Sequence, residues 1–139
     1  MLPFLELSKR LAARGHAVAF VSTPRNLARL PPVPPHLSAR LHFVPLPMPR
    51  VEGLPEGAEC TADVTPGKDD LLKKAFDGLA APFAAFLAAG RRPDWIIHDF
   101  YHHWLPPIAD EHKVRACLLP AIYLLGTSSS DDAYLWIWN

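Results

Sequence analysis

The feature that most limits the fold of this chain is an alternation of short apolar runs with segments of helical periodicity. The run at 17–21 is bounded by Gly15 and by Thr23 and Pro24, as buried parallel strands are. Further runs occupy 41–46, 95–98 and 114–119, and helices are expected at 2–14, 25–30, 69–89 and 104–112. The alternation predicts an α/β fold with a Rossmann-like parallel sheet and helices on both faces.

The first predicted helix lacks the strand that such a topology requires before it. A crossover helix in a parallel sheet follows one strand and leads to the next, and nothing precedes residues 2–14 here. We therefore expect the first strand of the sheet to be missing ahead of Met1. The edges of two other strands would then be unpaired.

The middle of the chain is predicted to be a long loop followed by a bent helix. Residues 47–68 are rich in proline and glycine and have no usable period, so they form the loop. The helix expected at 69–89 begins with acidic residues and carries an apolar stripe at alternating spacings of four and three. Gly78 and Pro82 predict a kink within it.

Composition excludes several classes of partner. Fourteen Lys and Arg residues balance fourteen Asp and Glu residues without long blocks, so nucleic acid is not an expected partner. The longest apolar run, 116–125, is too short for a membrane span and contains Pro120. Cys60 and Cys117 have no disulfide or zinc spacing and no signal peptide is visible, which indicates a cytoplasmic protein.

Asp99 is the strongest candidate for a functional residue. It directly follows the strand predicted at 95–98, at the edge where α/β sheets collect catalytic groups. A carboxylate there could orient a histidine that acts as a general base. The alternative is that Asp99 caps the next helix, with His102 and His103 on its first turn. The two roles are compatible.

Two other chemistries have weaker support. His98, His102 and His103 lack a completing carboxylate or cysteine, so no metal site is expected. A hydrolase could use Asp99, His102 and one of the serines at 128–130, although no glycine-flanked nucleophile elbow surrounds them. No glycine-rich phosphate loop occurs.

Four segments together resemble the N-terminal domain of plant UDP-dependent glycosyltransferases: LPFLELSKRLAARGHAVAFVSTPRN, PMPRVEGLPEGAEC, KKAFDGLAAPFAAFL and DWIIHDFYHHW. The branch that it resembles most extends the sugar chains of terpenoid and flavonoid glycosides. The resemblance implies the N-terminal half of a two-domain GT-B fold. Residues 1–126 would form a partial acceptor-binding domain and 127–139 a divergent tail, with the UDP-sugar-binding domain absent.

The resemblance also implies roles for individual residues. Asp99 matches the family aspartate that orients a catalytic histidine, and that histidine would lie just before Met1. Val51, Gly53, His103, Trp104 and Phe100 would border the acceptor pocket, although packing is the simpler role for each.

The expected function is therefore that of a fragment. Its parent would transfer a sugar from UDP-sugar to a hydroxyl of a small-molecule acceptor, without a metal, and this chain alone would be inactive. The alternative is a non-catalytic acceptor-binding or interaction module. The sequence leaves the oligomeric state open.

Overall fold

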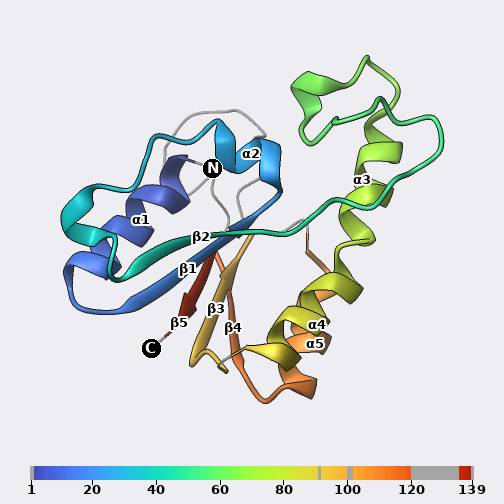
Figure 1. Ribbon diagram of the computed structural model, residues 1–139. Coiled ribbons are helices and arrows are strands. Elements are labelled where there is room, and N and C mark those ends of the chain that lie inside the picture. The colour runs from blue at the N-terminus through green and yellow to red at the C-terminus, as the bar shows by residue number, and fades with distance from the viewer. Residues whose placement is uncertain (1, 91, 100–101, 120–134, 139) are drawn as a thin grey trace.

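The computed structural model of the protein describes residues 2–90, 92–99, 102–119 and 135–138 (Figure 1). The helices are α1 (Leu2–Ala13), α2 (Pro24–Ala28), α3 (Asp69–Asp77), α4 (Ala80–Ala89) and α5 (Leu105–Glu111), with short 3-10 turns η1 (Pro35–Leu37) and η2 (Thr61–Asp63). The strands are β1 (Ala17–Ser22), β2 (Leu41–Pro45), β3 (Trp95–His98), β4 (Arg115–Leu118) and β5 (Leu135–Trp138). The predicted α/β alternation is confirmed.

The strands form one five-stranded sheet in the order β2-β1-β5-β3-β4. β1 is parallel to β2 and β3 is parallel to β4, as expected for a Rossmann-like sheet. The central strand β5 is antiparallel to both β1 and β3, so the sheet is mixed rather than wholly parallel. β5 pairs with the two edges that the sequence analysis expected to be open. The reason is that a strand has backbone donors and acceptors on both sides, and it can satisfy two edges in either direction.

Two apolar cores lie on opposite faces of this sheet. Val18 and Phe20 of β1 point to one core, and Val21 of the same strand points to the other, as the two-residue period of a strand requires. α1 contributes Phe4 and Leu5 to the first core. The second core contains residues of α3, α4 and α5: Leu72, Phe76, Phe83, Leu87, Leu105 and Ala109. Helices therefore cover both faces, as predicted (Figure 1).

The kink predicted near Gly78 is a complete break between α3 and α4. Gly78 ends α3, and a Cβ atom built on it would lie 2.5 Å from Pro49 Cγ. Pro82 lies in the first turn of α4, where a missing backbone N–H is tolerated. The glycine thus allows the loop after β2 to pass close to the helix.

Two findings concern membrane spans and the state of the cysteines. No helix among the described residues is long and apolar enough to cross a membrane. Both cysteines, Cys60 and Cys117, are free thiols.

Candidate functional site

The carboxyl ends of β1, β2 and β3 meet at one edge of the sheet, which is where ligands bind in folds of this class. Ser22 and Thr23 stand at the end of β1, Leu46 follows β2, and Asp99 follows β3. Thr23 is 0% exposed and Asp99 is 4% exposed. The sequence therefore brings polar side chains to a buried position at this edge.

A small cavity lies at this edge. Its volume is about 10 Å³, close to that of one water-sized probe. The lining residues come from the ends of β1 and β2, from the α3–α4 break and from the segment after β3: Val21, Ser22, Thr23, Leu46, Leu79, His102 and Trp104. We call this space the edge cavity.

His102 is held against the backbone of Asp99. Its Nδ1 lies 3.4 Å from the Asp99 carbonyl oxygen, and Nδ1 of His98 lies 2.9 Å from the same oxygen. A carbonyl oxygen only accepts, so each Nδ1–H donates and Nε2 of His102 is left as an acceptor in the neutral ring. The two imidazoles thereby fix the peptide group next to the candidate carboxylate.

Both of these histidines are neutral at pH 7. Burial, assisted by the neighbouring His98 and His103, lowers the pKa of His102 to about 3, although its hydrogen bond to Asp99 opposes the shift. Burial also lowers the pKa of His98. His102 therefore presents an uncharged ring to the edge cavity.

Trp104 is fixed by aromatic contacts just before α5. Its ring meets His102 edge-on at 5.3 Å and 88°, and it lies 5.9 Å from the ring of Phe83 on α4. His103, one residue earlier, is exposed, and its Nδ1 lies 3.7 Å from the Asp77 carboxylate. Neighbouring residues in the sequence therefore face opposite environments.

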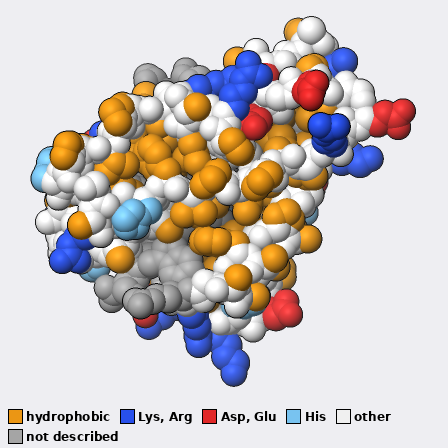
Figure 2. All heavy atoms as spheres, viewed as in Figure 1, with side chains coloured by type: hydrophobic (Ala, Val, Ile, Leu, Met, Phe, Trp, Pro, Cys, Tyr) orange, Lys and Arg blue, Asp and Glu red, His pale blue; other side chains and the backbone are white. Residues whose placement is uncertain are grey.

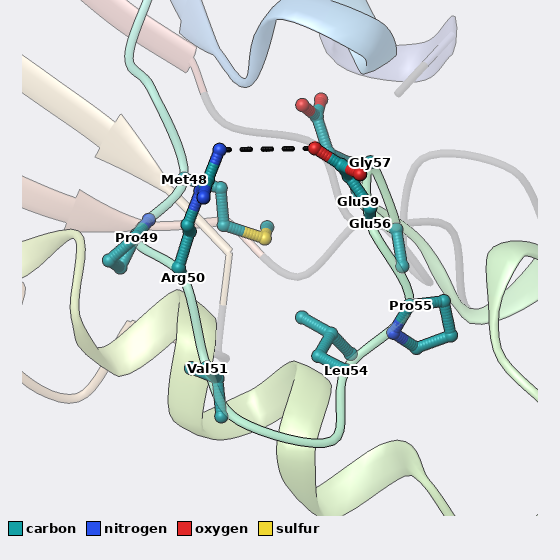
Figure 3. Close-up of a pocket in the computed structure, with 10 residues that line it drawn as sticks. Met48, Pro49, Arg50, Val51, Leu54, Pro55, Glu56, Gly57 and Glu59 are labelled. Atoms are coloured by element: carbon teal, nitrogen blue, oxygen red, sulfur yellow. Dashed lines mark ion pairs between the residues drawn. The ribbon is translucent and has the colours of Figure 1, made fainter.

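A second, larger pocket is formed by the loop after β2. Its volume is about 520 Å³, and we call it the loop pocket. Figure 3 shows Met48 and Leu54 pointing into it, and Arg50 facing Glu56 across the opening at 3.8 Å. That ion pair is almost fully exposed, so it contributes little to stability. In the view of Figure 1, hydrophobic side chains gather in a band across the middle of the molecule, with charged groups toward its rim (Figure 2).

Helix α2 holds the base of this loop. The Glu59 carboxylate accepts hydrogen bonds from the backbone N–H groups of Arg25, at 2.6 Å, and Asn26, at 3.2 Å. The Asn26 side chain donates to the Glu59 carbonyl oxygen at 2.7 Å. The N-terminal N–H groups of a helix have no partner within the helix, so a carboxylate is favoured there. These bonds connect Glu59, which lines the loop pocket, to helix α2, which directly follows β1.

An ion pair reinforces this connection. The Arg29 guanidinium lies 2.5 Å from the Asp63 carboxylate, which also accepts backbone hydrogen bonds from Glu59 and Cys60. Burial alone would raise the pKa of Asp63, but the hydrogen bonds from Arg29, the Glu59 backbone and Cys60 hold it well below its usual range. Asp63 is therefore ionised throughout the physiological range.

Comparison with known proteins identifies the relatives of this chain. No protein-family model matches it. UDP-glycosyltransferase 91D1 of Stevia rebaudiana is 51% identical over 97% of the chain, and soyasaponin III rhamnosyltransferase of Glycine max is 41% identical over 81%. The chain is related to the plant UDP-glycosyltransferases. It spans only about a quarter of these relatives, 28% and 24% of their lengths.

Solved glycosyltransferase structures share the fold. Glycyrrhiza uralensis UGT73P12, complexed with glycyrrhetinic acid 3-O-monoglucuronide, aligns over 92% of this chain and 29% of its own, with a TM-score of 0.74 and 23% identity. Arabidopsis thaliana UGT89C1, complexed with UDP-L-rhamnose, covers 84% of this chain and 31% of its own, with a TM-score of 0.68 and 23% identity. The resemblance to GT-B glycosyltransferases seen in the sequence is confirmed at the level of the fold.

The candidate residues named from the sequence lie in different parts of the structure. His102 and Trp104 line the edge cavity, three and five residues after Asp99. Val51 lines the loop pocket, whereas Gly53 is an exposed turn residue with φ of +83° whose carbonyl accepts from Lys68. Phe100 and the serines at 128–130 lie outside the described residues.

Two further outcomes concern the chemistry at the edge. Within the described residues, no three His, Cys, Asp or Glu side chains are grouped to hold a metal ion. Thr23, which the sequence analysis did not single out, lines the edge cavity and follows a buried strand in the same way as Asp99. The rule that singled out Asp99 would have found it.

Proposed function

We propose that this chain forms the acceptor-binding part of an inverting UDP-glycosyltransferase. The proposed reaction joins a sugar from UDP-sugar to a hydroxyl of a small glycosylated terpenoid or flavonoid. The sequence similarity to soyasaponin III rhamnosyltransferase and to the anthocyanidin-3-O-glucoside rhamnosyltransferase of Petunia hybrida supports this substrate class. The single observation that carries the proposal is the buried Asp99 at the carboxyl edge of the sheet, in the family-like context DWIIHDF.

The proposed chemistry gives Asp99 a positioning role. In the transfer, the acceptor hydroxyl oxygen forms a bond to the anomeric carbon as the bond from that carbon to UDP breaks. The proton passes to a histidine base, and Asp99 orients this imidazole and stabilises its positive charge. The resemblance puts that histidine before Met1, and neither His98 nor His102 replaces it because burial lowers the pKa of both imidazoles and makes them weak bases.

The proposed acceptor site combines the two pockets. The loop pocket, with Val51 in its wall and Gly53 at its turn, is of the size that small ligands occupy. Trp104 belongs to the proposed second wall, where its aromatic face packs against a sugar or aglycone ring. The resemblance also assigns Phe100 and His103 to this wall, but the His103 ring is exposed beside Asp77 and Phe100 lies outside the described residues. The 3.8 Å pair of Arg50 and Glu56 would border the entrance.

The remaining parts of the proposal concern the donor and the cell. UDP-sugar is the donor, no metal takes part, and a further domain would bind the nucleotide. Because that domain and the histidine are needed to bring the reacting atoms together, this chain alone is proposed to be inactive. The free thiols of Cys60 and Cys117 support a cytoplasmic setting.

Calorimetric titration with a flavonoid glucoside, together with an assay for UDP release from UDP-glucose or UDP-rhamnose, tests the proposal. We expect glycoside binding and no UDP release by the purified chain. UDP release above that of an Asp99→Asn variant would contradict the proposed inactivity. Absence of glycoside binding would contradict the acceptor site.

The alternative is a non-catalytic module that binds glycosides. The loop pocket, which is built by residues 48–59 alone, is the observation that favours it. The Asp99→Asn variant distinguishes the two functions. A glycosyltransferase part that includes this chain needs the carboxylate for turnover, whereas a binding module retains its affinity in Asp99→Asn.

A further inference from the structure

The edge cavity contains two buried polar atoms that the mechanism above does not use. Thr23 is 0% exposed, and the Nε1 atom of Trp104 is buried although part of its ring is not. Among the described residues, neither Thr23 Oγ1 nor Trp104 Nε1 has a hydrogen-bond partner. Buried polar groups in folded proteins are normally paired, so two such atoms in the lining of one cavity point to a ligand.

The size and lining of the cavity restrict the chemistry of that ligand. The volume of about 10 Å³ admits about one oxygen atom with its hydrogen. Besides Thr23 and Trp104, the wall consists of the apolar side chains of Val21, Leu46 and Leu79, of Ser22 and of the uncharged His102 ring. A wall without a charged group disfavours a carboxylate or an ammonium group. The indole N–H can only donate, whereas the threonine hydroxyl can donate or accept. A neutral hydroxyl, which does both, satisfies this pair.

We infer that Thr23 and Trp104 form a buried subsite for one neutral hydroxyl group, supplied by the acceptor sugar or by water. The oxygen of this hydroxyl accepts from Trp104 Nε1–H, and its hydrogen is donated to Thr23 Oγ1. Contacts with Phe83 and His102 fix the indole in place for this bond. If the hydroxyl belongs to an acceptor sugar, the inference rests on the proposed function. If the hydroxyl belongs to water, the inference is independent of the proposed function.

Nuclear magnetic resonance of the indole N–H groups tests the subsite. The Trp104 signal is assigned by its loss in Trp104→Phe, and the probe is phenyl β-D-glucopyranoside. In the free chain we expect a cross-relaxation peak between water and the Trp104 indole proton. If an acceptor hydroxyl enters, the glucoside displaces that peak and shifts the indole signal. Thr23→Val should then weaken glucoside binding about tenfold.

Each result decides the inference. A water peak that is unchanged by the glucoside, and lost in Thr23→Val, supports the subsite with water as its hydroxyl. The inference is overturned if the free chain shows no water peak and the glucoside does not shift the Trp104 indole signal. It is also overturned if the water peak and the glucoside shift are both unchanged in Thr23→Val. If Thr23→Val does not fold, the spectra of the unchanged chain decide alone.

Matched controls separate this inference from the proposed function. Thr61→Val and Trp95→Phe remove the same groups at exposed positions and should leave the Trp104 signal unchanged. If calorimetry shows no glucoside binding while the water peak persists, the proposed function fails and the subsite stands. If the glucoside binds without Thr23 or Trp104 being involved and no water peak is seen, the subsite fails and the proposed function stands.

Discussion

The guanidinium of Arg29 lies 2.5 Å from the carboxylate of Asp63, a residue 34 positions later in the sequence. This ion pair joins helix α2 to the η2 turn and closes the base of the loop that forms the loop pocket. Asp63 also accepts backbone hydrogen bonds from Glu59 and Cys60, so this carboxylate joins Arg29 to the backbone of the loop, beside the Glu59 carboxylate that binds the start of α2.

Asp63→Asn should destabilise the protein by about 1–2 kcal/mol at pH 7, because an amide cannot replace the charge-assisted bonds and Arg29 is partly exposed. Urea denaturation measures this loss. Asp94→Asn, an exposed control, should cost less than about 0.5 kcal/mol. Equal losses in the two variants would contradict the role of Asp63.

The Asp63 contribution also has a defined pH dependence. Its pKa is lower in the folded than in the unfolded protein, so the contribution is complete above the ordinary value of 3.8. It is lost as the pH falls through the lower folded value. The stability difference between the native chain and Asp63→Asn should therefore be constant from pH 7 to 5 and shrink only below pH 4.

His102 should make the protein sensitive to mild acid. Its pKa falls from 6.5 to about 3 on folding, so the unfolded chain binds a proton that the folded chain excludes. Stability should be full above pH 6.5 and decline toward pH 3, with a loss of about 2 kcal/mol at pH 5 from this residue. The lowered pKa of His98 acts in the same direction.

Denaturation at pH 7.5 and pH 5 measures this acid sensitivity. His102→Gln should reduce the difference between the two pH values, whereas the exposed control His36→Gln should retain it. An unchanged difference in His102→Gln would show that other groups cause it.

A proline at position 136 should disrupt the centre of the sheet. Trp136 is paired with Ala19 on one side and Ile96 on the other, so its N–H faces a neighbouring strand in either case. Trp136→Pro removes that donor and should cost about 3 kcal/mol, with self-association through the exposed edges of β1 and β3. Light scattering and circular dichroism on heating would detect both effects.

Gly78→Ala should destabilise the protein by about 1–3 kcal/mol, although alanine is the better helix former. The added Cβ would lie 2.5 Å from Pro49 Cγ and 3.2 Å from the Ala75 carbonyl oxygen. Thermal denaturation decides the sign. Adding Pro49→Ala should recover part of the loss, and a Gly78→Ala variant that is more stable than the native chain would refute the packing argument.

Much of the local structure was predictable because it depends on short-range patterns. The run at 17–21 became β1 and the stripe beginning at Leu72 became α3 and α4, since burial repeats every two residues in a strand and every three to four in a helix. Gly78 and Pro82 marked the break between α3 and α4 because both residues disfavour a continuous helix. The position of Asp99 at the end of β3 was predictable because this residue directly follows the apolar run at 95–98.

The candidate site was only partly predictable. The sequence named Asp99 and Trp104 as candidates, and the structure places both near the carboxyl edge of the sheet. Nothing in the sequence showed that His103 faces Asp77 while His102 is buried beside Trp104. Such choices depend on which neighbours pack around the segment. Thr23 could have been named by the rule that singled out Asp99, but the sequence did not show that it lines a cavity, because its neighbours there come from other strands and from the α3–α4 break.

The sequence by itself determined the α/β class, the elements and the relationship to plant UDP-glycosyltransferases. It did so because periodicity and local motifs are read within a few residues. Only the tertiary structure decided that Leu135–Trp138 fills the centre of the sheet in the antiparallel direction. Every residue except proline carries the same backbone donor and acceptor, so a strand's sequence does not specify which edge it joins or in which direction.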